Sequence, residues 1–232
     1  MAAPRHAIEQ WTVPVLPCRR CCTSRRASGA RAAFLFGGGK RESETAGETS
    51  AAPKPPQLSP SFSVLRCTSA YELRVYDAFV AARTPYSTRA DGLQRLSEYL
   101  DGRANATGVR LPATSPVFTF YSSSDGVLTK HMELMVSLPP GETQTPSPVA
   151  DSGVQLRIAG GGEILAALEM RGNVTPEAAD AGRTRLVAAL AQDGLALVAE
   201  EAGMGAFRLA TYGPLYSLAP RRNELMVRVQ LG

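Results

Sequence analysis

Residues 221–231 end the chain in a pattern that strongly restricts its fold. Leu225, Val227, Val229 and Leu231 alternate there with Met226, Arg228 and Gln230. This period of two is typical of a strand with one buried face. The tetrapeptide Glu-Leu-Met-Val at 224–227 also occurs at 133–136, which is 91 residues earlier. The repeated strand sequence predicts that the elements before each copy repeat as well.

The first half of the expected repeat contains two strands, a helix and two further strands. Thr88 is suited to cap the helix, and Leu93, Leu96 and Leu100 recur at helical spacing before Gly102 ends it. The strands are expected at residues 71–76, 78–84, 117–121 and 130–138.

The second half is expected to follow the same order. Thr175 and Pro176 begin a longer helix, and Gly194 ends it. The inward face of this helix is predicted to consist of Ala179, Gly182, Leu186 and Leu190. Strands are expected at residues 154–158, 164–170, 195–199, 207–212 and 221–231.

The predicted fold is therefore an α+β domain made of two ββαββ pseudo-repeats. Joining the repeats into one curved antiparallel sheet, or a distorted β-barrel, with each helix on the outside buries both apolar faces. Glu133 and Glu224 take equivalent positions in this scheme. They could form a carboxylate pair for acid–base work, but pairing with Arg221, Arg222 or the backbone is the favoured alternative.

The charge is unevenly divided along the chain. Residues 1–68 contain 10 Lys and Arg against 4 Asp and Glu, whereas residues 69–232 contain 15 against 17. A mildly acidic domain lacks the positive surface that binding to nucleic acid requires, so we expect no nucleic-acid partner. No apolar run approaches the roughly 20 residues of a transmembrane helix.

The N-terminal region has the composition of a targeting segment. Up to Arg41 it contains eight basic residues and one acidic residue, which is typical of a transit peptide. We expect residues 1–41 to direct import into a plastid, with a mitochondrial address or an unaddressed cytoplasmic tail as alternatives. Residues 42–68, rich in Pro, Ser and Thr, are predicted to be a disordered linker, and residues 69–232 the folded domain.

Three sequence segments, in order, resemble one protein family. Residues 71–76 (YELRVY), 114–117 (TSPV), and 212–214 with 221–224 (YGP…RRNE) are similar to the Y-E-x-R-x-Y, T-[SA]-P-V and Y-x-P…R-R-N-E segments of the SOUL haem-binding proteins. The resemblance covers about residues 69–232. It implies a distorted β-barrel of two pseudo-repeats that binds haem or a related tetrapyrrole without a shared catalytic activity.

The resemblance also implies where the ligand binds, namely at the first helix and the loop before Arg221. A flat apolar ring needs an apolar surface, and its propionates need cations at the rim. The predicted surface residues are Leu93, Leu96, Tyr99, Leu215 and Tyr216. The predicted propionate partners are Arg95, Arg103 and Arg221. The alternative is that the leucines pack in the core and that the arginines bind loop carbonyls.

His131 is the one histidine outside the N-terminal segment. Haem iron commonly takes a histidine ligand, so His131 is the candidate metal ligand, although a solvated histidine at a strand start is the simpler interpretation. The chain has no nucleophile-elbow sequence, and we expect no enzyme.

Two hypotheses of function follow. The first is a non-catalytic tetrapyrrole carrier or buffer in a plastid. The second is an interaction protein that kept the fold and lost the ligand, associated peripherally with a plastid structure. Ala113, where many family members have Met, and the loop at residues 215–220 depart from the family pattern and favour the second hypothesis.

Overall fold

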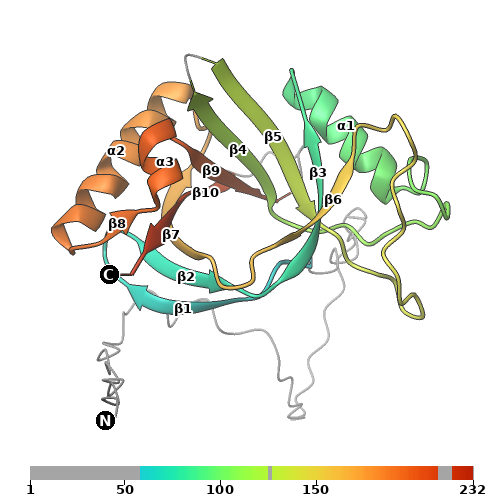
Figure 1. Ribbon diagram of the computed structural model, residues 1–232, viewed down its shortest axis with the longest axis horizontal. Helices are drawn as coiled ribbons and strands as arrows, with labels where there is room; N and C mark the ends of the chain where they lie inside the picture. The colour runs from blue at the N-terminus through green and yellow to red at the C-terminus, as the bar shows by residue number, and fades with distance from the viewer. Residues whose placement is uncertain (1–57, 125–126, 214–220, 232) are drawn as a thin grey trace, which may run out of the picture. The chain divides into compact units, whose positions relative to one another are not determined.

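A computed structural model describes residues 58–124, 127–213 and 221–231 (Figure 1). The predicted transit peptide, most of the predicted linker, and the candidate residues Leu215 and Tyr216 lie outside the described residues.

The described residues form one curled antiparallel sheet with three helices, which makes a half-barrel (Figure 1). The sheet order is β1-β2-β7-β10-β9-β4-β5-β3-β6, and the short β8 pairs with β10. The strands are β1 Phe62–Cys67, β2 Glu72–Tyr76, β3 Phe79–Pro85, β4 Val117–Ser124, β5 Val127–Met135, β6 Gln155–Ala159, β7 Ile164–Arg171, β8 Ala196–Leu197, β9 Phe207–Tyr212 and β10 Arg222–Gln230. The helices are α1 Arg89–Leu100, α2 Pro176–Gln192 and α3 Ala199–Met204. The predicted α+β class and curved antiparallel sheet are confirmed.

The strand order has a symmetry of its own. If β2, β7, β10 and β9 are matched with β6, β3, β5 and β4, the order from β2 to β6 reads the same in both directions. Residues 133 and 224 fall on the matched strands β5 and β10. The internal sequence repeat itself stays a prediction, because strand order does not measure the similarity of the two halves.

The two long helices begin at the capping residues that the sequence indicates. The Thr88 hydroxyl accepts a hydrogen bond from the Asp91 amide, and the Thr175 hydroxyl accepts one from the Ala178 amide. Pro176 occupies the first turn of α2, where its missing N–H costs least. The buried face of α2 is Ala179, Gly182, Leu186 and Leu190, as predicted.

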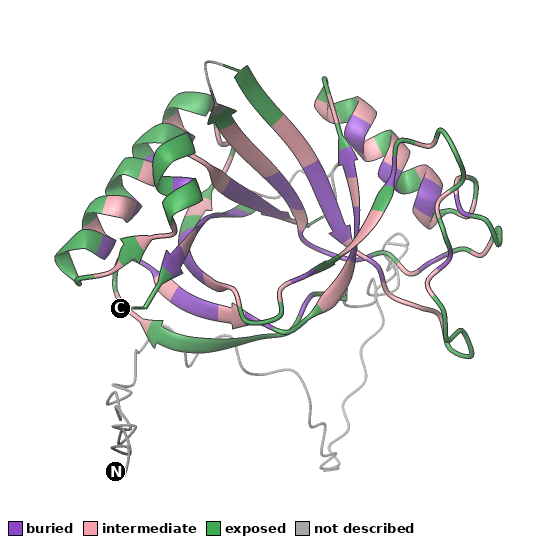
Figure 2. Cartoon of the chain, in the orientation of Figure 1, coloured by how far each residue is buried: buried purple, intermediate pink, exposed green. Residues whose placement is uncertain are grey.

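Side-chain alternation divides the sheet into two faces. On the convex face, Leu225, Val227 and Val229 of β10 pack with the buried side of α2, and Met132 and Leu134 of β5 pack with α1. On the concave face, a smaller apolar cluster is formed by Tyr76, Phe118, Leu165, Ala167, Ala210 and Met226. The strands contribute most of the buried residues and the helices contribute a buried stripe (Figure 2).

Strand β1 corrects the predicted boundary of the linker. Phe62–Cys67 pairs with β2, although residues 42–68 were expected to be disordered. All of its side chains are exposed or half-buried (Figure 2), so the segment lacks the alternation by which strands are recognised. Backbone pairing holds it in place, together with the Phe62 ring, whose centroid lies 5.1 Å from that of Tyr76.

The segment before β9 also differs from the prediction. A strand was expected at residues 195–199, but β8 has two residues, and α3 follows at Ala199–Met204. Glu201 of this helix is buried and accepts hydrogen bonds from the backbone N–H and from Nε of Arg228 at 2.6 and 2.7 Å. These tertiary contacts with β10 hold the short helix, and the local sequence carries no sign of them.

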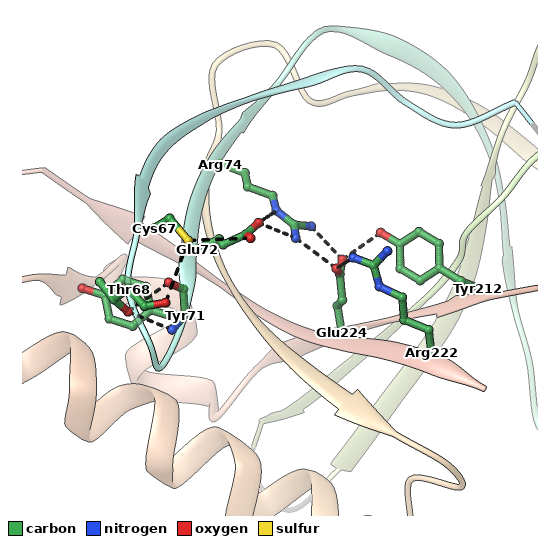
Figure 3. A network of polar contacts seen from close by, with 8 residues as sticks. All are labelled: Cys67, Thr68, Tyr71, Glu72, Arg74, Tyr212, Arg222 and Glu224. Atoms are coloured by element: carbon green, nitrogen blue, oxygen red, sulfur yellow. Dashed lines mark hydrogen bonds and ion pairs between the residues drawn. The ribbon is translucent and has the colours of Figure 1, made fainter. Parts of the chain in front are cut away.

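A buried ion pair connects β2 to β10 inside the curl of the sheet (Figure 3). Arg74 donates from Nη1 and Nη2 to the two carboxylate oxygens of Glu224, at 2.7 and 2.9 Å. The same carboxylate accepts from Tyr212 Oη at 2.7 Å and from Arg222 Nη2 at 2.6 Å. Glu72 accepts from the remaining side of the Arg74 guanidinium. Glu224 therefore has the structural pairing that was favoured over acid–base work, with Arg222 among its partners.

This pairing changes the titration of Glu224. Burial alone would raise the pKa of Glu224, but the hydrogen bonds and charge of Arg74 outweigh burial, and the pKa is lowered overall. Burial, followed by the charge of Glu224, raises the pKa of Tyr212, so this phenol stays protonated as the donor.

We predict that Arg74→Met lowers the free energy of unfolding by about 3–5 kcal/mol, because it leaves a buried carboxylate without its main partner. Guanidinium denaturation at neutral pH measures the difference. The control is Arg171→Met, which removes an exposed pair with Glu169 and should cost less than about 1 kcal/mol. Adding Glu224→Leu to Arg74→Met should recover most of the loss. Equal costs for the two single variants would contradict the prediction.

We also predict how this difference depends on pH. Because the folded pKa of Glu224 is lowered, the pair stabilises the fold above the unfolded pKa of Glu, about 4.3, and the stabilisation is lost as pH falls through the folded pKa. The gap between wild type and Arg74→Met should therefore narrow when denaturation is repeated at decreasing pH below that value. A gap that stays constant throughout acidification would show that the Glu224 charge does not cause it.

Candidate functional site

A groove on the convex face lies between the first turns of α1 and α2. Its space is about 1090 Å³, part of it open to solvent, and it is lined mainly by apolar and aromatic side chains. The principal ones are Tyr86, Tyr121, Leu128, Val174, Phe207 and Leu209. We call these six side chains the apolar bed of the groove. Binding sites for organic ligands are typically lined by side chains of this kind.

Strand register builds the floor of this groove. Tyr121 of β4 is paired with Phe207 of β9, and odd-numbered residues of both strands face the helices. Their rings are stacked, with centroids 4.9 Å apart and planes at 21°. The sheet therefore places a stacked pair of aromatic rings beneath the helix termini.

The groove continues into a second, more polar space. This space of about 540 Å³ is lined by Arg89, Asn173, Thr175, Thr211, Arg221 and Asn223, among others. Arg89, Val174, Thr175 and Leu209 line both spaces. The site is thus amphipathic, with an apolar bed at one end and hydrogen-bonding side chains at the other.

Positive charge gathers in this site. Arg89 Nη2 is buried, and no hydrogen-bond partner reaches it within the described residues. Lys130 Nζ lies 5.6 Å from the centre of the Tyr86 ring, and Arg221 lines the polar end. The N-terminus of the 17-residue helix α2 also opens here through Thr175 and Pro176, and a helix N-terminus favours anions. Asp180 is the acidic residue in the lining.

Tyr86 of the bed keeps its proton at ordinary pH. Burial, followed by a hydrogen bond with Tyr121, raises the pKa of Tyr86. A phenol of this kind offers ring surface and a hydroxyl rather than a phenolate. No His, Cys or Met side chain is found in the lining formed by the described residues.

Three residues that were predicted to form the apolar ligand surface lie in the core under α1 or pack against it. Leu96 and Tyr99 are fully buried in the core under α1, and Leu93 packs against that core. The Tyr99 hydroxyl donates to the Pro146 carbonyl at 2.7 Å. Leu96 and Tyr99 therefore cannot offer a surface to a ring, which corrects the prediction and agrees with its core alternative. The reason is that the leucine stripe of α1 faces the sheet.

The predicted arginines separate into two groups. Arg221 lines the polar end of the groove. Arg95 instead donates to the Pro85 carbonyl at 3.2 Å, and Arg103, two-thirds exposed, lies 3.7 Å from Asp101. The roles of Arg95 and Arg103 as propionate partners stay predictions, and neither side chain lines this groove.

His131 lies on the concave face, away from the groove. Its ring stacks on Phe120 with centroids 4.3 Å apart. Nδ1 is 3.1 Å from Arg83 Nη2, and Nε2 is 3.5 Å from Glu133 Oε1. Both ring nitrogens thus already have polar neighbours, and iron ligation by His131 stays a prediction. Across the described residues, no group of three or more His, Cys, Asp or Glu side chains is placed to hold a metal ion.

Sequence reasoning missed Arg89, Lys130 and the Tyr121–Phe207 floor. A signal for Arg89 was present, because it follows the Thr88 cap and must lie in the first turn of its helix. Nothing local indicates that the first turn of α2 lies beside it. That proximity arises from the sheet order, which brings β4 and β9 together between the two halves.

The domain is an open half-barrel with an amphipathic groove on its outer face. The sequence model of the SOUL heme-binding protein family matches residues 58–228. The chain therefore belongs to the SOUL heme-binding protein family. No curated protein matches the sequence closely enough to be identified as a relative. No helix in the described ranges is both long and apolar enough to cross a membrane.

Two of the solved structures that resemble this chain come from the bacterium Listeria innocua. A hydrolase from Listeria innocua has 12% identity and a TM-score of 0.50, covering 72% of this chain and 94% of that chain. A second hydrolase from the same organism has 10% identity and a TM-score of 0.49, covering 75% and 100%. At such identities the likeness concerns the fold alone, and the word hydrolase describes those proteins.

Proposed function

We propose that this protein binds haem or a related tetrapyrrole in the groove between α1 and α2. Family membership supports ligand binding of this kind, and the observation that carries the location is Arg89. A buried guanidinium nitrogen without a partner among the described residues, beside an apolar bed, needs an anionic group with an apolar body. A tetrapyrrole with carboxylate side chains has both parts.

The two ends of the groove suit the two parts of such a ligand. The ring system would rest on the bed formed by Tyr86, Tyr121 and Phe207. The carboxylates would extend toward Arg89 and Arg221, at the polar end where the N-terminus of α2 adds positive potential. The protein's part in this arrangement is to bind and orient the ligand through its outer face.

In this proposal the protein is a carrier or buffer and not a catalyst. The phenol of Tyr86 is held protonated, and the cations are placed to meet carboxylates. Binding would then rest on ring surface and charge rather than on a bond from a protein side chain to iron. This distinction can be tested directly.

We predict that the full-length protein binds haemin and metal-free protoporphyrin IX with dissociation constants within about threefold of each other, as measured by absorbance and fluorescence titration. The dimethyl ester of protoporphyrin IX, which lacks the carboxylates, should bind at least about tenfold more weakly, because charge-assisted hydrogen bonds contribute about 1.5–3 kcal/mol. Much tighter binding of haemin than of the metal-free ring would instead assign a protein ligand to the iron.

Substitution of arginines on α1 provides a matched test of location. Arg89→Met should weaken haemin binding at least about tenfold. Arg95→Met, which alters a half-buried arginine on the same helix that lies outside the groove lining, should leave it unchanged, as should His131→Ala. Loss of binding in His131→Ala would move the site to the concave face. No saturable binding by the folded wild-type protein would reject the carrier and favour the alternative, an interaction protein that kept the fold.

The plastid location is a separate proposal. It is supported by the arginine-rich composition of residues 1–41, with eight basic residues up to Arg41. A fusion of residues 1–60 to a fluorescent reporter should enter plastids in plant or algal cells, and mutation of the arginines to alanine should abolish entry. Mitochondrial or cytosolic fluorescence of the unaltered fusion would overturn this proposal without affecting the binding site.

A further inference from the structure

The concave face of the half-barrel contains a second cavity. An inner space of about 290 Å³, part of it open to solvent, is walled by the rings of Tyr76, Phe79, Phe118 and Phe120. It adjoins an outer hollow of about 620 Å³ that reaches α3. Phe120, Arg157, Glu163 and Arg208 line both spaces. Aromatic walls with a few charged groups are the usual composition of a site for a small organic molecule.

Buried polar atoms at this cavity lack hydrogen-bond partners among the described residues. The charged ones are Glu133 Oε1, Arg157 Nε and Arg208 Nε, and the Tyr76 hydroxyl is a further one. Glu133 is 1% exposed and Arg208 is 9% exposed. Unmade hydrogen bonds in the interior are unfavourable and therefore rare, yet these atoms all belong to residues that line the same cavity.

The incomplete pairing follows from how each group is held. Arg208 donates from Nη1 and Nη2 to the Glu163 carboxylate at 2.8 and 3.1 Å. Its Nε makes no hydrogen bond within the described residues. Arg157 Nε lies 3.2 Å from Glu133 Oε1 as an ion pair, but without hydrogen-bond geometry. Arg83 Nε is 3.9 Å from the same oxygen. His131 Nε2 also lies 3.5 Å from this oxygen. Glu133 Oε1 thus has cationic neighbours but accepts no hydrogen bond from the described residues.

The other half of the sheet shows that the fold does not require incomplete hydrogen bonding of the carboxylate. Glu224 lies 91 residues after Glu133 on the matched strand, and Arg74 on β2 precedes Arg157 on the matched β6 by 83 residues. Yet Glu224 accepts hydrogen bonds from Arg74, Tyr212 and Arg222 (Figure 3). The carboxylate of Glu224 thus accepts several hydrogen bonds, whereas Glu133 Oε1 has ion-pair contacts without a hydrogen bond from the described residues.

The unused atoms define the chemistry of a ligand. Two N–H donors and one carboxylate acceptor match a planar group that carries a carbonyl next to an N–H, such as an amide or lactam edge. A ligand carboxylate would face the charge of Glu133, and a ligand cation would face Arg83 and Arg157. We propose that the concave cavity is a second ligand site, which takes a small, neutral aromatic amide or lactam against its aromatic walls.

Three isosteric probes separate this proposal from simple charge attraction. Benzamide, benzoate and benzamidinium share one ring and differ in the charge and donor–acceptor pattern of the substituent. In titrations of the isotope-labelled full-length protein followed by amide chemical shifts, benzamide should saturate shifts in β4, β5 and β6, with an affinity at least about tenfold above the other two. Tighter binding of benzoate or benzamidinium would overturn the assigned chemistry.

Two neighbouring positions on β6 provide the structural test. Ala159 lines the inner cavity, so Ala159→Leu should fill it and abolish the benzamide shifts while the thermal melt stays cooperative. Ile158, 68% exposed, should tolerate Ile158→Ala with binding unchanged. Arg157→Met should weaken benzamide about tenfold by removing one donor. Binding that persists in Ala159→Leu, or no binding of any probe by the wild type, would overturn the proposal.

The outcome is independent of the tetrapyrrole proposal, because the groove and the cavity lie on opposite faces of the sheet. Haemin titration of the Arg157→Met variant should match wild type, and benzamide titration of Arg89→Met should also match wild type. Loss of both ligands in either variant would show one shared site and would overturn the assignment of two.

Discussion

The ion pair between Arg74 and Glu224 depends on the curl of the sheet and stabilises it in turn. Strand β7 separates the strands that carry the two residues, and Arg74 is level with Arg228, four residues beyond Glu224. In a flat sheet, with strands about 4.8 Å apart and about 3.3 Å per residue, their Cα atoms would lie about 16 Å apart. An arginine and a glutamate side chain together do not span that distance. The contact exists because the sheet closes toward itself, and two buried charges would be strongly unfavourable if it opened.

The curl gives the two faces of the sheet different chemistry. Residues of even number on β4, β9 and β10 face inward, where Phe118, Phe120 and Arg208 meet charged groups from β5 and β6. Odd-numbered residues face outward, where the helices cover most of the surface and leave the bed of Tyr121 and Phe207 between their first turns. One alternating pattern therefore supplies an apolar groove outside and a charged, aromatic cavity inside.

The sequence predicted the elements well where the signal is local. Hydroxyl caps marked the starts of both long helices, and helical spacing identified all four buried residues of α2. The sequence predicted elements poorly where contacts with distant residues determine the local structure. Strand β1 has no alternation and is held by β2, and α3 is held through Glu201 by Arg228. Likewise, Leu96 belonged to a correctly predicted stripe, but the stripe does not say whether the sheet or a ligand covers it.

The sequence by itself determined the α+β class, the period of its strands, the boundaries of its long helices and its family, because these depend on neighbours within a few residues and on short ordered motifs. Only the tertiary structure decided where binding can occur. Arg89, Lys130 and Arg221 are far apart in the chain and line one groove because β4 and β9 bring the two halves together. Tertiary structure also left Glu133 Oε1 without a hydrogen bond from the described residues while giving Glu224 several, since hydrogen-bond geometry depends on side chains that converge from distant strands.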